Sequence, residues 1–344
     1  MSMGERQLAR RDCKLSIVVP CYNEQDNLQA LHARVVAAAQ DAVGTSFEIV
    51  LVNDGSHDQT WPAMCGLASS DCRVVAVNLS RNHGHQLALS AGLSLAVGAR
   101  ILILDADLQD PPELLGEMMR LMDAGADVVY GRRTHRAGES FFKRWTARVF
   151  YRLMNRLTNT PIPMDTGDFR LMSRRILTVL NSMPEEHRFV RGMVSWIGFR
   201  QVPIDYARDP RRRGSSGYPL RRMLRLAMDA VTSFSTRPLR LASLLGLSFS
   251  GLGVIGVCAS IAAWLAGITL PGWTSVMVVV LVLGGVQLAV IGILGEYVGR
   301  IYMEVKRRPL YVIEEVFQAA PRSPARDYAS ESSAVPQPNS PGGS

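Results

Sequence analysis

The fold is indicated most clearly by residues 100–110, which read Arg100-Ile101-Leu102-Ile103-Leu104-Asp105-Ala106-Asp107-Leu108-Gln109-Asp110. The first half is short, branched and apolar, as is typical of a strand buried on both faces of a parallel sheet. Carboxylates that follow such a strand point into the crevice where open α/β sheets bind ligands. Asp105, Asp107 and Gln109 are spaced to offer oxygen atoms to Mg²⁺ or Mn²⁺, with positions left for phosphate oxygens. The alternative is a solvated acidic loop.

Further apolar runs alternate with helical patterns in the first part of the chain. We expect strands at 15–20, 47–52, 74–77 and 127–130, and a helix from about Glu24. Strands that alternate with helices predict an α/β protein with a doubly wound, mostly parallel sheet covered on both faces.

Polar residues follow two more of these strands. Pro20, Tyr22, Asn23 and Glu24 come at the end of the first strand and Asp54 at the end of the second, so all are expected at the same crevice as Asp105. A nucleotide base could stack near Tyr22, while Glu24 and Asp54 accept hydrogen bonds from base or ribose. The first strand is followed by neither a glycine-rich dinucleotide fingerprint nor a Walker lysine loop. A diphosphate held by a metal is the remaining economical solution.

Composition points to an anionic partner. The 344 residues carry a net charge of +8 and are 47% hydrophobic. Nucleic acid, acidic lipid headgroups and phosphorylated substrates all fit that charge. The five cysteines are scattered without zinc-ligand spacing, so reduced thiols are expected. The charged residues 1–12 lack the apolar core of a secretory signal.

The second half of the chain shows membrane patterns. Residues 140–157 and 220–231 read as basic amphipathic helices suited to a membrane interface, with a core-packed surface helix as the alternative for the first. Residues 241–295 contain no charged side chain, which suits two spans joined by a turn near Pro271. Basic residues flank this region on both sides, so both ends are expected in the cytoplasm.

These patterns divide the chain into six parts. We expect a disordered N-terminus at 1–13, a cytoplasmic catalytic domain at 14–219 and a juxtamembrane amphipathic segment at 220–240. A transmembrane helical hairpin follows at 241–299, then a cytoplasmic return segment at 300–317 and a disordered tail at 318–344.

Several motifs together resemble the inverting family 2 glycosyltransferases, which have the GT-A fold. The sequence looks similar to the polyprenyl-phosphate branch, which includes bactoprenol glucosyltransferases and dolichol-phosphate-mannose synthases, from about Leu15 to Val312. The motifs are Val18-Val19-Pro20-Cys21-Tyr22-Asn23-Glu24, Val52-Asn53-Asp54-Gly55-Ser56, Ser80-Arg81-Asn82-His83-Gly84, Asp105-Ala106-Asp107-Leu108-Gln109, Asp165-Thr166-Gly167-Asp168-Phe169-Arg170 and 188–199.

The resemblance implies an enzyme that moves a hexose, usually glucose from UDP-glucose, to undecaprenyl phosphate with inversion. It implies Mg²⁺ or Mn²⁺ as cofactor, the lipid bilayer as partner, no nucleic acid, a homotetramer as one assembly, and the bacterial inner membrane as location. The implied catalytic residues are Asp168, Asp107 and Arg170, with Asp168 ranked as the base. Implied metal and diphosphate ligands are Asp105, Asp107 and Gln109, and implied substrate-binding residues are Pro20, Tyr22, Asn23, Glu24, Asp54, Asp105, Arg133, Arg213 and Ser216.

Other readings stay open at this point. The donor could be GDP-mannose, or the chain could be a non-catalytic membrane scaffold that retains a nucleotide-sugar domain. Asp168 could instead be a turn carboxylate that caps a helix beginning near Ser173. Gly217 stands where relatives have a lysine, and Arg213 or Arg221 could replace it. His83 and His85 are not expected to bind metal, because no carboxylate is expected to converge on their loop.

Overall fold

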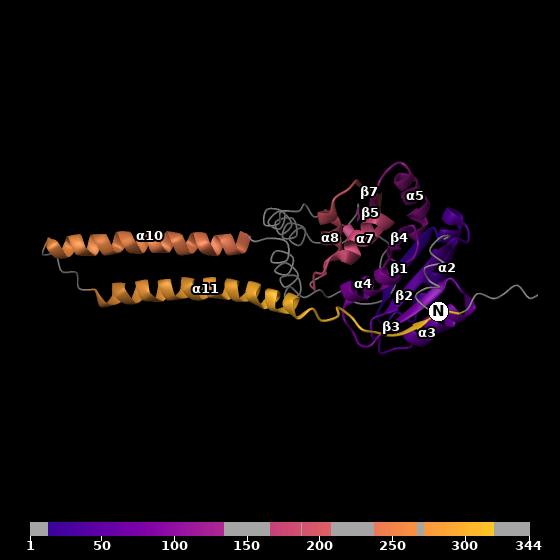
Figure 1. Ribbon diagram of the computed structural model, residues 1–344, viewed down its shortest axis with the longest axis horizontal. Helices are drawn as coiled ribbons and strands as arrows, with labels where there is room; N and C mark the ends of the chain where they lie inside the picture. The colour runs from indigo at the N-terminus through magenta and orange to yellow at the C-terminus, as the bar shows by residue number, and fades with distance from the viewer. Residues whose placement is uncertain (1–12, 134–165, 187, 208–236, 267–271, 320–344) are drawn as a thin grey trace, which may run out of the picture.

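The structure is a computed structural model, and it describes residues 13–133, 166–186, 188–207, 237–266 and 272–319 (Figure 1). The two predicted amphipathic helices, at 140–157 and 220–231, lie outside the described residues. So do Arg213, Ser216 and nearly all of both predicted disordered ends.

One mixed sheet of eight strands forms the centre of the described α/β domain, in the order β7-β5-β6-β4-β1-β2-β3-β8. β1 lies in the middle and pairs in parallel with β2 on one side and β4 on the other. The strands are β1 (Leu15–Cys21), β2 (Phe47–Asn53), β3 (Val74–Leu79), β4 (Arg100–Ile103), β5 (Val128–Arg133), β6 (Thr166–Ser173), β7 (Gln201–Tyr206) and β8 (Ile313–Phe317).

The five strands expected from sequence are all present, and the predicted fold class is confirmed. Three strands were missed. β6 pairs antiparallel with both β4 and β5. Its apolar side chains alternate with Asp168 and Arg170, and charged residues at alternate positions ordinarily indicate a solvated face rather than a strand buried on both faces.

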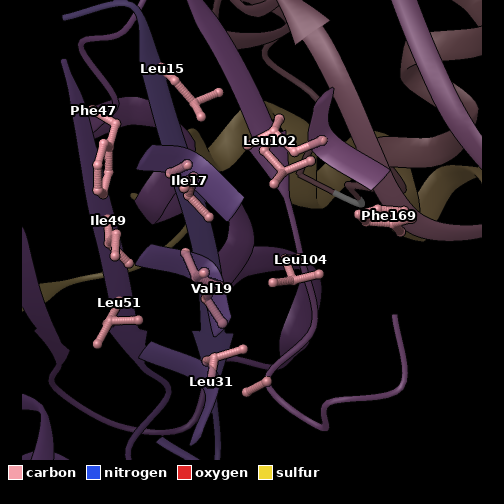
Figure 2. Close-up of a cluster of buried hydrophobic side chains, with 14 of the residues drawn as sticks. Leu15, Ile17, Val19, Leu31, Phe47, Ile49, Leu51, Leu102, Leu104 and Phe169 are labelled. Atoms are coloured by element: carbon pink, nitrogen blue, oxygen red, sulfur yellow. The ribbon is translucent and has the colours of Figure 1, made fainter. Parts of the chain in front are cut away.

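Helices cover both faces of the sheet. On one face lie α2 (Leu28–Val43), α3 (Thr60–Ser70) and α5 (Leu115–Asp123); on the other lie α4 (His85–Leu95), α7 (Arg174–Ser182) and α8 (Val190–Ile197). Figure 2 shows the first core, where alternate side chains of β1, β2 and β4 pack beside Phe169 of β6. The predicted first helix begins at Leu28 rather than Glu24, because Glu24–Asn27 forms a turn before it.

Two long helices follow the catalytic domain, α10 (Arg237–Leu265) and α11 (Trp273–Lys306). They lie side by side and extend away from the sheet (Figure 1). Both are long and apolar enough to cross a membrane, and their apolar side chains are exposed. The predicted pair of apolar C-terminal helices is confirmed, with α11 continuing past the expected limit at 299.

The segment after α11 returns to the sheet. α11 ends at Lys306, and the next residue, Arg307, has a left-handed φ of 48° that turns the chain. β8 then pairs antiparallel with β3 and forms one edge of the sheet. The Tyr311 hydroxyl lies 3.0 Å from Ser94 Oγ of α4, and Glu304 Oε1 accepts a hydrogen bond from the Glu186 backbone N–H at 2.9 Å. The end of the second long helix is therefore fixed to the catalytic domain on both sides.

Close packing of α4 on the sheet gives a first prediction. A Cβ at Gly92 would contact Val18 Cγ1 and lie 2.9 Å from Val52 Cγ2, both in the buried sheet. Gly92→Ala should therefore lower the free energy of unfolding by about 1–3 kcal/mol through overpacking. Thermal unfolding of the purified protein measures this. Gly66→Ala on α3 is the matched control, because a Cβ there meets nothing within 4 Å and should not destabilise the protein. Equal unfolding temperatures for the two variants would contradict the packing argument.

Candidate functional site

The candidate site lies at the carboxyl edge of the three central strands. β2, β1 and β4 are adjacent and parallel, so the residues that follow them meet at one edge. These are Asp54 after β2, the loop from Tyr22 to Glu24 after β1, and Asp105 after β4. The site is built from loops, but each loop begins at a rigid strand end.

Asp54 organises the loop that begins α4. It is buried, and its Oδ1 and Oδ2 accept hydrogen bonds from the backbone N–H groups of His83 (2.7 Å) and Gly84 (3.0 Å). Gly55 makes this approach feasible: its φ is +61°, and any Cβ there would collide with the backbone of Arg81 and Asn82. Burial raises the pKa of Asp54, although the two backbone hydrogen bonds oppose that rise. The Asp54 side chain thus fixes the start of α4 as well as lying at the predicted nucleoside position.

The loop after β1 presents an exposed aromatic ring. Tyr22 is 43% exposed, and its ring meets the edge of the His57 ring at a centroid distance of 6.3 Å. Asn23 has a left-handed φ of 55° and is held by hydrogen bonds to Ser56 Oγ (3.0 Å) and from the His57 N–H (3.0 Å). Glu24 Oε2 accepts a hydrogen bond from Asn27 Nδ2 at 2.5 Å. These hydrogen bonds fix the loop, and it presents the exposed Tyr22 ring at the carboxyl end of β1.

The acidic loop after β4 turns sharply. Leu108 has a left-handed φ of 60°, and Asp107 Oδ1 accepts the Gln109 N–H at 3.2 Å. Asp105 Oδ1 is buried, lies 3.6 Å from His85 Nε2, and has no hydrogen-bond partner among the described residues. Burial raises the pKa of Asp105 to about 6; the nearby charge of His85 lowers it, and that of Asp168 raises it. A buried carboxylate oxygen without a hydrogen-bond donor is suited to a cation.

Asp168 on β6 lies at the centre of a cluster of donors. Its Oδ2 lies 3.2 Å from His85 Nε2 and accepts a hydrogen bond from Gln86 Nε2 at 3.0 Å. Its Oδ1 accepts one from Arg191 Nη2 at 3.3 Å and lies 4.0 Å from Arg170 Nη2. Burial by itself raises the pKa of Asp168, but His85, Arg191 and Arg170 outweigh it and hold that pKa well below its usual range. Asp168 is therefore a fixed anion and a weak base.

Arg170, an implied catalytic residue, and Arg133, an implied substrate-binding residue, differ in their surroundings. Arg170 is 3% exposed and donates to the backbone carbonyls of Asp168 and Gly167, each at 3.2 Å. Burial lowers the pKa of Arg170 to about 10, so it remains charged at neutral pH. Arg133 is half-buried at the end of β5, donates to the Tyr206 hydroxyl at 3.2 Å and lies 3.8 Å from Asp110 Oδ1. Arg170 thus supports Asp168 from inside, whereas Arg133 lies at the rim.

The structure rules out one alternative reading and overturns one expectation. Asp168 does not cap the helix that follows, since it lies within β6 and the N-terminus of α7 has no side-chain cap. The sequence led us to expect no carboxylate near the loop of His83 and His85, and this expectation is wrong. Two carboxylates, those of Asp168 and Asp105, lie close to the His85 side chain. Burial lowers the pKa of His85, but its hydrogen bond to Asp168 and the negative charge of Asp105 outweigh that effect and raise the pKa.

Sequence reasoning also missed Gln86 and Arg191 as members of the site. Gln86 lies two residues after the motif at 80–84, and Arg191 lies within the motif at 188–199. These positions were the signal in the sequence that could have indicated both residues as members of the site. Neither residue's partner is local in sequence: Gln86 is separated from Asp168 by 82 positions and Arg191 from Asp168 by 23.

The acidic loop fits a divalent cation in part. Asp105, Asp107 and Gln109 carry oxygen ligands on one turn, and the buried Asp105 Oδ1 accepts no hydrogen bond from the described residues. Within the described residues, no group of three or more His, Cys, Asp and Glu side chains is gathered so as to hold a metal alone. A cation here would therefore need further ligands from water or phosphate, as Mg²⁺ commonly does.

Comparison with known proteins defines the class of this protein. Residues 16–180 match the family described as Glycosyl transferase family 2. The chain is 44% identical over 308 residues to the uncharacterized glycosyltransferase YkcC of Bacillus subtilis, covering 89% of this chain and 95% of that protein. It is 39% identical over 309 residues to the bactoprenol glucosyl transferase of Shigella phage SfII, covering 90% of this chain and 100% of that protein. The chain belongs to glycosyltransferase family 2 and has its GT-A-type fold.

Two solved structures resemble the chain more distantly. Staphylococcus aureus TarS 1–349 in complex with UDP-GlcNAc is 20% identical, with a TM-score of 0.44 over 64% of this chain and 66% of that one. The glucosyl-3-phosphoglycerate synthase of Mycobacterium tuberculosis, solved with Mn²⁺, UDP-glucose and phosphoglyceric acid, is 20% identical, with a TM-score of 0.43 over 67% of this chain and 82% of that one.

The raised pKa of Asp105 predicts a pH-dependent stability. Because this pKa rises in the folded state from its ordinary value near 4 to about 6, the folded protein binds more protons than the unfolded chain between these pH values. Stability should therefore fall as pH rises from about 4 to 6, by at most about 3 kcal/mol. In EDTA, Asp105→Asn should abolish that part of the fall in melting temperature, whereas Asp41→Asn on the exposed face of α2 should retain it. Parallel curves for wild type and Asp105→Asn would contradict the assignment.

Proposed function

We propose that this protein moves glucose from UDP-glucose to undecaprenyl phosphate with inversion, producing a lipid-linked sugar for cell-envelope glycosylation. The observation that carries the proposal is 39% identity along 90% of this chain to a protein named bactoprenol glucosyl transferase. The described residues support it with a group of carboxylates, Asp54, Asp105 and Asp168, linked through the start of α4, and with two long apolar helices attached to the same domain.

The donor would lie across the carboxyl ends of β1, β2 and β4. Tyr22 offers an exposed ring for stacking a base, and Pro20, Asn23, Glu24 and Asp54 line the same edge. Asp105, Asp107 and Gln109 would hold Mg²⁺ or Mn²⁺, which when bound supplies positive charge to the diphosphate leaving group. Arg133 at the rim, with Arg213 and Ser216, would bind phosphate groups.

Asp168 serves this reaction as an anion rather than as the proton acceptor. The lowered pKa leaves it ionised but weakly basic at neutral pH. An acceptor phosphate is already largely ionised there, so it needs positioning more than deprotonation. Asp168 would orient sugar hydroxyls and stabilise positive charge that develops at the anomeric carbon. Arg170 holds Asp168 in place by donating hydrogen bonds to the backbone carbonyls of Gly167 and of Asp168 itself.

The two long helices would anchor this chemistry at the inner membrane, where the lipid acceptor resides. α10 and α11 would form a hairpin whose ends both lie in the cytoplasm, with the basic segments 140–157 and 220–231 at the interface. A homotetramer remains a prediction.

Sugar transfer into lipid tests the proposal directly. Full-length protein in undecaprenyl-phosphate liposomes should convert radiolabelled UDP-glucose into an organic-extractable product, and EDTA should abolish this conversion. GDP-mannose run in parallel distinguishes the mannosyl alternative. Failure with every nucleotide sugar tested, with folded protein and added Mn²⁺, would favour the non-catalytic scaffold.

Two variants separate the metal site from the anion. Asp107→Ala should lower transfer by at least about 100-fold, because leaving-group charge loses its stabilisation, and should abolish Mn²⁺-dependent binding of UDP-glucose. Asp168→Asn should lower kcat by a similar factor while keeping Mn²⁺-dependent donor binding. Equal Mn²⁺-dependent binding by wild type and Asp107→Ala, measured calorimetrically, would refute the metal assignment.

A further inference from the structure

Gln86 uses both ends of its side-chain amide inside the site. Nε2 donates to Asp168 Oδ2 at 3.0 Å, and Oε1 accepts the backbone N–H of Val190 at 2.9 Å. An amide has a donor end and an acceptor end, while a carboxylate only accepts and a backbone N–H only donates. Only one orientation of the amide can therefore make both bonds, and the side chain is fixed in that orientation.

These bonds close a ring of contacts around Asp168. Val190 begins α8, and the next residue, Arg191, donates to the other carboxylate oxygen, Oδ1, at 3.3 Å. Asp168 is thus held between α4, through Gln86, and α8, through Arg191, while Gln86 also joins the two helices directly. A carboxylate held at both oxygens cannot rotate about its Cβ–Cγ bond without breaking a hydrogen bond.

Gln86 differs from the other donors to Asp168. His85 lies 3.6 Å from Asp105 as well, and Arg191 and Arg170 carry charge. Gln86 is neutral, so its hydrogen bond orients the Asp168 carboxylate without adding a full charge beside the reacting sugar. Its own position is set by the start of α4, which Asp54 fixes through the N–H groups of His83 and Gly84.

We propose that Gln86 is a positioning residue for transfer: it sets the plane of the Asp168 carboxylate and couples that plane to the start of α8. The proposal rests on the role given above to Asp168. Loss of the amide leaves Asp168 ionised and in contact with His85 and Arg191, but it removes the donor that ties the plane of the carboxylate to the backbone at the start of α8. The chemical step should slow, because small misplacements of a catalytic group cost up to about 100-fold in rate, while donor binding at the β1, β2 and β4 ends is retained.

Gln86→Met tests this, because it keeps the length of the side chain and removes both hydrogen bonds. We expect kcat for sugar transfer to fall about 10- to 100-fold with the KM for the nucleotide sugar within about twofold of wild type. Gln201→Met is the matched control. Gln201 Nε2 donates to the Val194 and Gly198 carbonyls at the other end of α8, each at 2.9 Å, and does not reach Asp168. This control should lower the melting temperature but leave kcat near wild type; an equal kcat loss in both variants would show that Gln86 merely supports α8.

A double-mutant cycle with Asp168→Asn tests whether Gln86 acts through the carboxylate. Once the carboxylate is gone, adding Gln86→Met should lower kcat by less than about threefold more. If the kcat loss of the double variant equals the product of the two single losses, the two residues act independently and the proposal is wrong. If wild type transfers no sugar, the proposed function fails, and the same double-mutant cycle is then measured by melting temperature. A decrease for the double variant that is smaller than the sum of the two single decreases supports coupling between Gln86 and Asp168. A decrease equal to that sum refutes the coupling.

Discussion

Parallel pairing of β1 with β2 on one side and β4 on the other is the constraint on which the site depends. That pairing places Cys21 opposite Asn53 and Val18 opposite Ile103, so the chain leaves all three strands at one edge. The register is held by side chains that are buried on both faces of the sheet. Figure 2 shows the core on one of these faces. Slipping any strand by one residue would exchange its two buried faces, and the polar residues beyond its end would no longer meet.

Burying so much charge at this edge is costly, and the structure compensates each carboxylate differently. Asp54 accepts two backbone N–H groups, and Asp168 is surrounded by His85, Gln86, Arg191 and Arg170. Asp105 is the least compensated of the three, and the pKa values reflect this: that of Asp168 falls well below the usual range, whereas that of Asp105 rises. Neighbouring carboxylates with pKa values shifted in opposite directions perform different tasks.

The long helices are not a loosely tethered anchor. Glu304 near the end of α11 accepts a hydrogen bond from the Glu186 backbone in the loop that precedes α8, and β8 completes the sheet edge beside β3. α8 in turn carries Arg191, a direct partner of Asp168. Glu186, which contacts the end of α11, and Arg191, which contacts Asp168, are therefore only a few residues apart in the chain, and this arrangement suits the proposed transfer to a lipid acceptor.

The sequence by itself determined the alternating α/β pattern, the polar residues beyond the first, second and fourth strands, and the two apolar helices. These are local properties, since periodicity, strand-ending residues and long uncharged runs can be read within a short window. Only the tertiary structure decided that β6 lies between β4 and β5, that β8 returns to the edge beside β3, and that His85, Gln86 and Arg191 converge on Asp168. Pairing between residues as far apart as Gln86 and Asp168, 82 positions along the chain, depends on which strands become neighbours, and local patterns do not specify that.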